Sequence, residues 1–368
     1  MSSKSIILAA GGSGGHVFPA QAIAENFLSK HWSVVFISDS RGIEFSKTFP
    51  PAVSKFSLGL KNPRSGGVFG FLISIFLIVR GLFTVLKLYF KIRPNVVVGF
   101  GGYPSVPALI AAMILRIPIA IHEQNTILGS VNSLFRNKAF FIGFGIEPPK
   151  MPNVRGKAAV TGNPIRESLL SVTPLSYGGL KEDIIKILII GGSQGATFIS
   201  TTGCKAICEL PSVLKARVEV YHQCRLEENY EVKNEYTNSG VLASTKPFFT
   251  NIEELLNTSH LVICRAGAST LTELCLFGRP SLIIPLPSSS KNHQVFNAKF
   301  MEKNGASVVL YQSETTSELL SVEIANFIKD RKLRALMAQS ALNLSNRGAG
   351  QIFAEKIIRK IDGIVYEK

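Results

Sequence analysis

A short apolar run followed by a glycine turn occurs twice in this chain, 180 residues apart. The first copy is IILAA at 6–10 with GGSGGH at 11–16, and the second is ILII at 187–190 with GGSQGA at 191–196. An apolar run followed by a tight turn into a helix is the pattern of a buried parallel strand and the helix after it. Bare N–H groups in the turn and the N-terminus of the helix suit a phosphate or an oxyanion. Two copies therefore predict two nucleotide-fold domains that face each other across a cleft.

The rest of the chain alternates predicted strands with predicted helices. A length of 368 residues fits two domains better than one. Gly162-Asn163-Pro164 marks the junction, so we expect domains over 1–164 and 165–344, with a helix over 345–368 that packs back on the first. The expected strands are 5–10, 33–37, 95–99, 117–121, 139–142, 158–161, 185–190, 217–222, 241–243, 260–264, 281–285 and 307–310. The expected helices are 16–30, 69–91, 105–115, 128–136, 195–208, 251–257, 269–277, 292–303 and most of 322–361. This order predicts an α/β fold with two doubly wound, Rossmann-like domains.

The net charge of +15 is concentrated in the first domain. Residues 1–164 hold 17 Lys and Arg against five Asp and Glu, whereas 165–344 hold 18 against 17. No acidic residue stands between Phe45 and His122, a stretch with nine basic ones. Such a one-sided field indicates an anionic partner: a membrane surface, a nucleic acid or a phosphorylated substrate.

The segment 68–90, VFGFLISIFLIVRGLFTVLKLYF, is strongly apolar and has basic residues on both flanks. Three interpretations stay open. It is a membrane span interrupted by Arg80 and Lys87, an ordinary buried helix, or a helix that is partly covered and presents apolar and basic residues to a bilayer. Nucleic acid is disfavoured, because the chain shows no zinc-ligand spacing, RNA-recognition signature or helix-turn-helix.

The sequence lacks the usual cofactor motifs. The first glycine turn has no Gly-Lys-Ser/Thr, and Val17 stands where a dinucleotide fingerprint has its last glycine. Four aspartates and no Asp-x-Asp make a protein-held divalent metal unexpected, so we expect no cofactor. Five cysteines without paired spacing, and residues 1–10 without a signal-peptide pattern, fit a reduced cytoplasmic protein.

Polar clusters stand at the carboxyl ends of the predicted strands, where such folds bind ligands. His16 opens the first helix and is either a general base or a histidine satisfied by backbone. The four polar residues 122–125 are costly to bury unless they face a site or a wet cleft. Arg166 is a diphosphate partner or part of a surface salt bridge. Glu273, one turn into a helix opened by small residues, suits the hydroxyls of a ribose.

These clusters together resemble the MurG family. The matching motifs, which span essentially the whole chain in order, are GGSGGHVFP (11–19), GGY (101–103), HEQN (122–125), GNPIR (162–166), GGSQGA (191–196) and RAGASTLTE (265–273). The resemblance implies the GT-B fold and transfer of N-acetylglucosamine (GlcNAc) from UDP-GlcNAc to undecaprenyl-diphosphoryl-N-acetylmuramoyl-pentapeptide (lipid I), forming lipid II for peptidoglycan. It also implies peripheral binding to an anionic membrane surface, on the cytoplasmic face of the bacterial cell membrane. Other cell-wall synthesis proteins are further implied partners, and nucleic acid is not.

By this resemblance the second domain holds the UDP-sugar, and transfer is inverting and metal-independent. The implied base is His16, with Glu123 as second choice, and Arg166 and helix dipoles stabilise the diphosphate. The implied substrate contacts are Ser13, Gly14, Gly15, Tyr103, Asn125, Arg166, Ser193, Phe249, Ala268, Ser269, Thr270, Leu271, Thr272, Glu273 and Gln294. Two places depart from the family pattern: Phe249 replaces an isoleucine, and 287–291 replaces a more acidic or amide-rich loop.

Three other functions are alternatives to this one. A glycosyltransferase with a diacylglycerol or polyprenol acceptor would share the nucleotide half, and acceptor assays would separate it. An oxidoreductase would bind NAD(H) and not UDP, which the missing fingerprint disfavours. A purely structural membrane-surface protein would not need polar clusters at so many strand ends.

Overall fold

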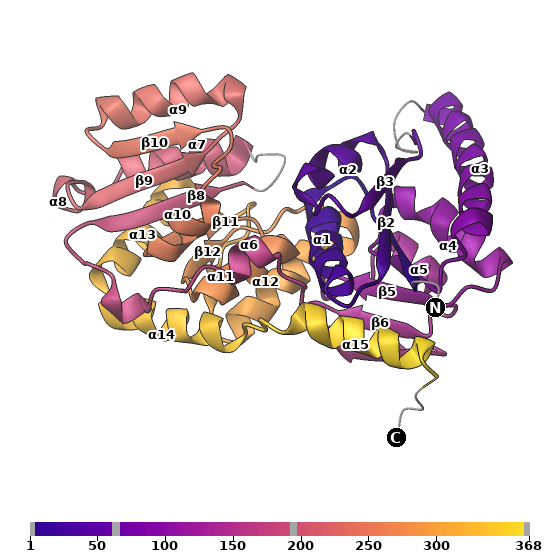
Figure 1. Cartoon of the computed structure of the whole chain (residues 1–368). Coiled ribbons are helices and arrows are strands. Elements are labelled where there is room, and N and C mark those ends of the chain that lie inside the picture. Colours follow the sequence, from indigo (N-terminus) through magenta and orange to yellow (C-terminus); the bar gives the residue numbers. More distant parts are fainter. Residues whose placement is uncertain (1–3, 61–66, 192–196, 364–368) are drawn as a thin grey trace. The chain divides into compact units, whose positions relative to one another are not determined.

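The computed structural model divides into two compact units, residues 1–170 with 347–368 (unit 1) and residues 171–346 (unit 2). The structure describes residues 4–60, 67–191 and 197–363, with backbone alone at 67–72. Each unit has its own sheet with helices on both of its faces (Figure 1). The predicted α/β class with two Rossmann-like domains is confirmed.

Unit 1 is built on seven parallel strands in the order β3-β2-β1-β4-β5-β6-β7. The strands are β1 (Ser5–Ala9), β2 (Ser33–Ser38), β3 (Ser54–Ser57), β4 (Val96–Gly99), β5 (Ile119–Glu123), β6 (Phe141–Phe144) and β7 (Lys157–Val160). The helices are α1 (Gly14–Leu28), α2 (Ser40–Phe45), α3 (Gly67–Ile92), α4 (Val106–Ile114), α5 (Ser130–Phe135), α6 (Glu167–Leu170) and α15 (Ala349–Ile361), with short 3₁₀ turns at Ser46–Thr48 and Tyr103–Ser105. The order reverses direction between β1 and β4, and open parallel sheets bind ligands at such a switch point.

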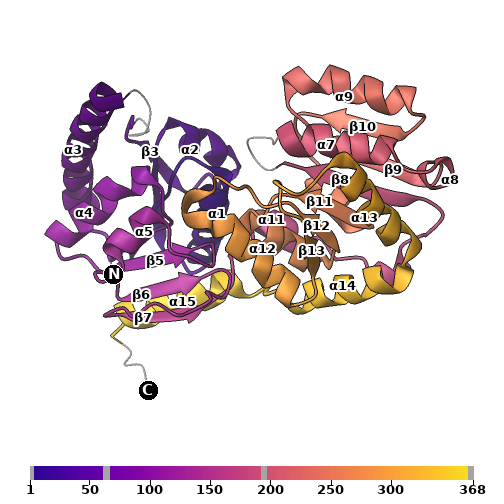
Figure 2. The same cartoon turned by 180° about the vertical axis from the view of Figure 1, so that it is seen from behind.

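The central strand of unit 1 is buried on both faces. Ile6 and Leu8 pack in the core formed with α1 and α15, whereas Ile7 and Ala9 pack in the core formed with α3 and α4. Successive side chains of a strand point to opposite faces, so a continuous apolar run is required here. Figure 2 shows α15 beside β6, where Phe353 packs against Phe141.

Unit 2 repeats this arrangement with six parallel strands in the order β10-β9-β8-β11-β12-β13. The strands are β8 (Ile185–Ile190), β9 (Val218–Gln223), β10 (Leu242–Lys246), β11 (Leu261–Cys264), β12 (Ser281–Ile283) and β13 (Ser307–Val309). The helices are α7 (Thr197–Cys208), α8 (Ser212–Lys215), α9 (Leu226–Asn238), α10 (Ile252–Thr258), α11 (Ala268–Phe277), α12 (His293–Lys303), α13 (Ser317–Lys329) and α14 (Arg331–Asn343), with 3₁₀ turns at Tyr177–Gly179 and Ser290–Asn292. Its switch point lies between β8 and β11.

Five helices and strands were not predicted, namely β3, α2, α6, α8 and α9, and several strand ends were wrong. The edge strand β3 has four exposed side chains and no apolar run, while α2 is a single short helix. The helix α9 buries only Val232 and Tyr236, so its sequence reads as polar throughout. The predicted strand 117–121 in fact extends to Glu123, because His122 and Glu123 pair with β6 and their side chains find partners inside the protein.

The apolar segment forms α3, and it is covered on one side only. Its described part, Ile73–Ile92, is long and apolar enough to cross a membrane by length and composition, yet only 22% of it is buried. Val85 and Tyr89 face the core of unit 1. Phe76, Phe83 and Phe90 are 67%, 61% and 67% exposed, and their spacing of seven residues places them on one face. The interpretation as an ordinary buried helix is therefore wrong.

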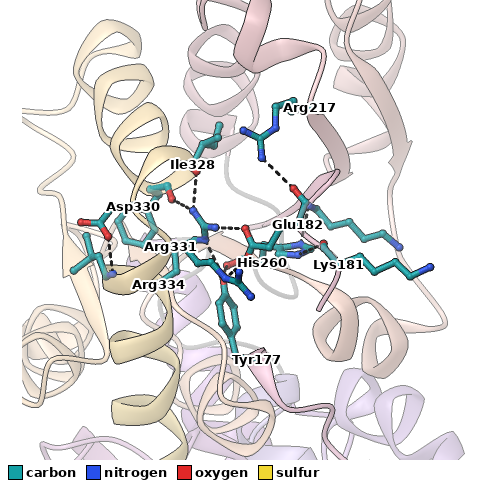
Figure 3. Close-up of polar contacts among 12 residues, drawn as sticks. Tyr177, Lys181, Glu182, Arg217, His260, Ile328, Asp330, Arg331 and Arg334 are labelled. Carbon is teal, nitrogen blue, oxygen red and sulfur yellow. Dashed lines mark hydrogen bonds and ion pairs between the residues drawn. The ribbon is translucent and has the colours of Figure 1, made fainter. Parts of the chain in front are cut away.

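A network around the buried side chain of Arg334 ties together distant parts of unit 2 (Figure 3). The guanidinium forms an ion pair with Glu182 and donates to the carbonyls of Phe327 and Ile328, the latter at 2.8 Å. Its Nε donates to the hydroxyl of Tyr177 at 3.1 Å, and that hydroxyl donates to the carbonyl of His260 at 2.9 Å. The segment leading into β8 is thus fastened to α13 and α14.

The stability of unit 2 is expected to depend on pH through His222. Burial lowers the pKa of His222 to about 3, and its Nδ1 lies 2.9 Å from the hydroxyl of Tyr236. The unfolded chain binds a proton below pH ~6.5 that the folded histidine refuses, so stability falls as the pH drops below that value. When the pH is lowered from 7.5 to 5.5, the parent protein should lose about 1.4 kcal/mol more of its free energy of unfolding than the variant His222→Gln does. Urea titrations at both pH values measure it, and equal losses in variant and parent would contradict it.

Candidate active site

The predicted site residues of unit 1 gather at the carboxyl edge of its sheet. Ser13–His16 follow β1, and Tyr103 follows β4, its neighbour across the switch point. Glu123 ends β5, Asn125 comes just after it, and Arg166 follows β7. The structure therefore brings segments from four parts of the chain to one edge, as the strand-end pattern predicts.

The imidazole of His16 lies against three glycines. Gly101 and Gly102 have φ angles of +91° and +78°, and the N–H of Gly11 donates to the carbonyl of Gly101 at 2.8 Å. A Cβ on Gly102 would lie 2.5 Å from the Cα of Gly11. A Cβ on Gly11 would lie 3.0 Å from Cδ2 of His16, and one on Gly101 would lie 3.3 Å from its Cε1. The two loops can approach each other and the ring only because these positions have no side chain.

The first helix begins inside the glycine turn. Ser13 is the residue before α1 and has extended backbone, but its side chain makes no capping hydrogen bond to the helix. The first N–H groups of a helix have no partner within it. A Cβ on Gly15 would meet nothing within 4 Å, so open space adjoins this end. The turn can present N–H groups and a hydroxyl to an anionic or polar ligand.

Tyr103 is held through Asp39. Its hydroxyl donates to Oδ2 of Asp39 at 2.7 Å, while Oδ1 accepts from the N–H of Gly42 at 2.9 Å. Burial, together with the hydrogen bond to Asp39, raises the pKa of the Tyr103 phenol well above its usual range. The phenol therefore stays protonated and its ring is fixed beside the glycine loop.

Glu123 is buried, and both of its carboxylate oxygens accept hydrogen bonds. Oε1 accepts from the backbone N–H and the side-chain amide of Asn125, at 3.2 and 2.9 Å. Oε2 accepts from the N–H of Gly129 at 2.8 Å and from the side-chain amide of Asn132 at 2.9 Å. These four donors fix the position of the carboxylate, which in turn organises the loop after β5. To act as a base it would have to leave these partners, which favours His16 between the two candidates.

His16, Gln124 and His122 are linked in a row. Nδ1 of His16 lies 3.0 Å from Oε1 of Gln124. Nε2 of Gln124 lies 3.3 Å from Nδ1 of His122 and 3.2 Å from its carbonyl oxygen. Nε2 of His122 lies 3.2 Å from the carbonyl oxygen of Gly162. Burial lowers the pKa of His122 to about 4, so this ring is neutral at physiological pH.

Two further predicted residues of unit 1 are held in place by neighbours. The amide of Asn125 donates to Glu123, as described above. The guanidinium of Arg166 stacks on the ring of Phe18, with Cζ 4.2 Å from the centroid. Stacking of this kind fixes the plane of the guanidinium.

In unit 2 the predicted residues surround the N-terminus of α11. This helix starts at Ala268, immediately after β11, and Gly267 precedes it in extended conformation. The hydroxyl oxygen of Ser269 is buried and has no hydrogen-bond partner among the described residues. The guanidinium of Arg265 is bound within the protein, because it donates to the carbonyl of Ile284 at 3.0 Å and to Gln312 at 2.8 Å. Ser269, Thr270, Thr272 and the half-buried Glu273 thus form the polar end of this helix.

Two further predicted residues of unit 2, Gln294 and Phe249, follow β12 and β10. The amide oxygen of Gln294 accepts from the N–H of Leu286 at 3.0 Å, and no described residue accepts from its amide nitrogen. The ring of Phe249 is buried after β10, 6.4 Å from the ring of Tyr221. Ser193 lies outside the described residues.

Gln124, His122 and Asp39 were not singled out as site residues from the sequence. The first two belong to the HEQN motif, but nothing in a single sequence shows which of four polar residues turn inward. Asp39 follows β2, and its proximity to Tyr103 depends on the strand order β2-β1-β4. Within the described residues no group of three or more His, Cys, Asp or Glu could hold a metal ion.

Two family models match most of the chain. Residues 6–140 match the glycosyltransferase family 28 N-terminal domain, and residues 186–352 match the glycosyltransferase family 28 C-terminal domain. The chain belongs to glycosyltransferase family 28. The predicted enzyme class, a hexosyltransferase, is thereby confirmed.

Curated relatives match over nearly their whole length. One from Caulobacter vibrioides is 35% identical over 96% of this chain and 98% of its own. One from Rhodospirillum centenum is 36% identical over 97% of this chain and 95% of its own. Both are named UDP-N-acetylglucosamine–N-acetylmuramyl-(pentapeptide) pyrophosphoryl-undecaprenol N-acetylglucosamine transferase.

A solved structure supports the same relationship. The crystal structure of Acinetobacter baumannii MurG superposes with a TM-score of 0.78 at 26% sequence identity, over 97% of this chain and 99% of that one. The resemblance to the MurG family, and with it the GT-B fold, is confirmed.

Proposed function

We propose that this protein transfers GlcNAc from UDP-GlcNAc to the muramoyl 4-hydroxyl of lipid I, forming lipid II in peptidoglycan synthesis. The observation that carries the proposal is the full-length match at 33–36% identity to relatives that are all named as this transferase. Because the match covers both units, we infer that this chain uses the same donor and the same acceptor as these relatives.

Unit 1 would bind the acceptor and unit 2 the donor. In unit 2, Gln294 keeps an amide nitrogen for a ligand, and the polar end of α11 suits a diphosphate and a ribose. Ser193 and the backbone at Phe249 would complete this donor site. In unit 1, Ser13–Gly15, Tyr103, Asn125 and Arg166 would surround the acceptor sugar and its diphosphate.

The reaction would be a direct displacement with inversion. His16 takes the proton of the muramoyl 4-hydroxyl while that oxygen forms a bond to the anomeric carbon of GlcNAc. The bond from that carbon to the UDP oxygen breaks, and UDP leaves with the electron pair. The positive end of α11 would stabilise the leaving diphosphate, without a bound metal.

Transfer of radiolabelled GlcNAc from UDP-GlcNAc to a lipid I analogue, with EDTA present, tests the proposal. A lipid II-type product supports donor, acceptor and metal independence together. Binding of UDP-GlcNAc without transfer would reject the acceptor, and no binding of UDP-GlcNAc would reject the proposal as a whole.

We further propose that α3 docks unit 1 on the cytoplasmic face of the membrane. Phe76, Phe83 and Phe90 share a face with the exposed Arg80 and Lys87, at spacings of three and four residues. Aromatic rings beside basic side chains suit the interface of an anionic bilayer, because burial of the rings adds to attraction for the headgroups. The protein would be peripheral.

Replacing two of these rings should weaken membrane binding. We expect Phe76→Asp with Phe83→Asp to reduce association with phosphatidylglycerol-containing vesicles more than about tenfold, since each buried phenyl contributes about 2 kcal/mol. Co-sedimentation measures the effect. Leu226→Asp is the matched control, because Leu226 is 72% exposed on α9 of unit 2 and should leave binding unchanged. Equal binding by the double variant and the parent would remove α3 from this role.

A further inference from the structure

We propose that Gln124 and His122 are positioning residues that hold His16 in one tautomer, with the proton on Nδ1 and the lone pair on Nε2. The proposal rests on the proposed function, in which His16 accepts the proton of the acceptor hydroxyl. It adds the residues that prepare His16 for that step.

The backbone fixes the orientation of the Gln124 amide. One end of this amide lies 3.2 Å from the carbonyl oxygen of His122, and a carbonyl oxygen only accepts hydrogen bonds. The amide nitrogen must therefore be at that end, and the amide oxygen must face His16. Nε2 of Gln124 has two hydrogens and two acceptors, the carbonyl oxygen and Nδ1 of His122, so both are used.

The tautomers of both histidines follow from this orientation. Oε1 of Gln124 only accepts, so Nδ1 of His16 at 3.0 Å must carry a proton. Nδ1 of His122 accepts from the amide, so this ring carries its proton on Nε2, which donates to the carbonyl of Gly162 at 3.2 Å. A neutral His16 with Nδ1–H has its free lone pair on Nε2, the form needed in a general base.

The surroundings keep the row of hydrogen bonds intact. His122 is completely buried between Phe100 and Phe353, with ring centroids at 5.9 and 5.1 Å, and it stays neutral. A charged His122 could not accept from Gln124, and its burial prevents that state at physiological pH. The backbone of Gln124 is also held, because its carbonyl accepts from the amide of Asn163 at 3.0 Å.

The glycines keep the working edge of His16 clear. Cδ2 and Cε1 flank Nε2 in the ring, and these are the atoms that a side chain on Gly11 or Gly101 would crowd, at 3.0 and 3.3 Å. No described residue makes a hydrogen bond with Nε2 of His16. One nitrogen of the ring is thus engaged by the protein and the other is left for a substrate.

The tautomers can be read directly in the wild-type protein. Long-range ¹H–¹⁵N spectra of the full chain with labelled histidine distinguish protonated from unprotonated ring nitrogens, and His16→Asn and His122→Asn identify the signals among six histidines. We expect Nε2 of His16 and Nδ1 of His122 to be unprotonated. A protonated Nε2 on His16, or a protonated Nδ1 on His122, would overturn the proposal.

A variant tests the kinetic consequence. Gln124→Leu removes the acceptor at similar volume, so His16 should populate both tautomers, and kcat should fall at least about tenfold while KM and the Kd for UDP-GlcNAc stay within about twofold. Gln21→Leu is the matched control. Gln21 is buried in α1 of the same unit and its amide donates to the carbonyl of Thr48 at 3.0 Å, but it does not contact His16. It should lose stability similarly and keep its kcat.

The outcomes separate this proposal from the proposed function. An unchanged kcat in Gln124→Leu, or an equal loss in Gln21→Leu, would reject the positioning role. If the tautomers are as expected but His16→Ala turns over at the full rate, His16 is not the base. The hydrogen bonds among His16, Gln124 and His122 would then have only a structural role. No transfer by the wild type would reject the proposed function alone.

Discussion

Replacing His16 by alanine is expected to lower kcat for GlcNAc transfer by about 10²- to 10⁴-fold, the usual contribution of a general base. The Kd for UDP-GlcNAc should change less than about twofold, because the proposed donor residues follow strands of unit 2. Initial rates with a lipid I analogue measure kcat, and calorimetric titration measures donor binding.

Two further variants separate loss of the base from loss of structure. His16→Asn keeps a polar side chain but accepts no proton, so its kcat should fall as far as that of the alanine variant. Glu123→Gln replaces a carboxylate that accepts four hydrogen bonds, so it should first lower the melting temperature. Turnover at the wild-type rate in His16→Ala would remove His16 from the role, and a fully folded but inactive Glu123→Gln would transfer the role to Glu123.

Much of the fold was predictable because buried parallel strands have a strong pattern. The strands at 6–10 and 187–190 are buried on both faces, so every position in them is apolar. A continuous apolar run of this length is typical of a buried parallel strand. Elements on the surface do not need such a run. The strand β3 is exposed at the sheet edge, and α9 buries only two residues, so their sequences look like loops.

The site was predictable in its position but not in its internal bonding. Ligands of parallel sheets bind at the strand ends, so polar residues after β1, β4 and β5 were expected to meet. Which of them face inward depends on the register between β5 and β6, where His122 lies opposite Gly143. It also depends on Phe353 of α15, more than 200 positions later in the chain, which packs on His122. A single sequence contains no signal for such a contact.

Replacing Arg334 by alanine is expected to lower the free energy of unfolding of unit 2 by about 3–5 kcal/mol, because the buried charge network loses its centre. Glu182, the carbonyls of Phe327 and Ile328 and the hydroxyl of Tyr177 all lose their common partner. For a domain of this size the melting temperature should drop by about 10 °C. Thermal unfolding of the full chain, followed by circular dichroism and calorimetry, measures the change in the transition of unit 2.

The same carboxylate supplies the control. Arg331 also pairs with Glu182, with Nε 3.5 Å from Oε1, but its side chain is 65% exposed, and an ion pair in water contributes less than about 1 kcal/mol. Arg331→Ala should therefore shift the transition by only a degree or two, although it removes the same charge from the same helix. If both variants lost equal stability, burial of Arg334 would not be the cause. If neither did, the contacts of Arg334 would not stabilise unit 2, and the segment before β8 would be held by its other contacts, among them those of Leu175 with Asn257 and Arg279.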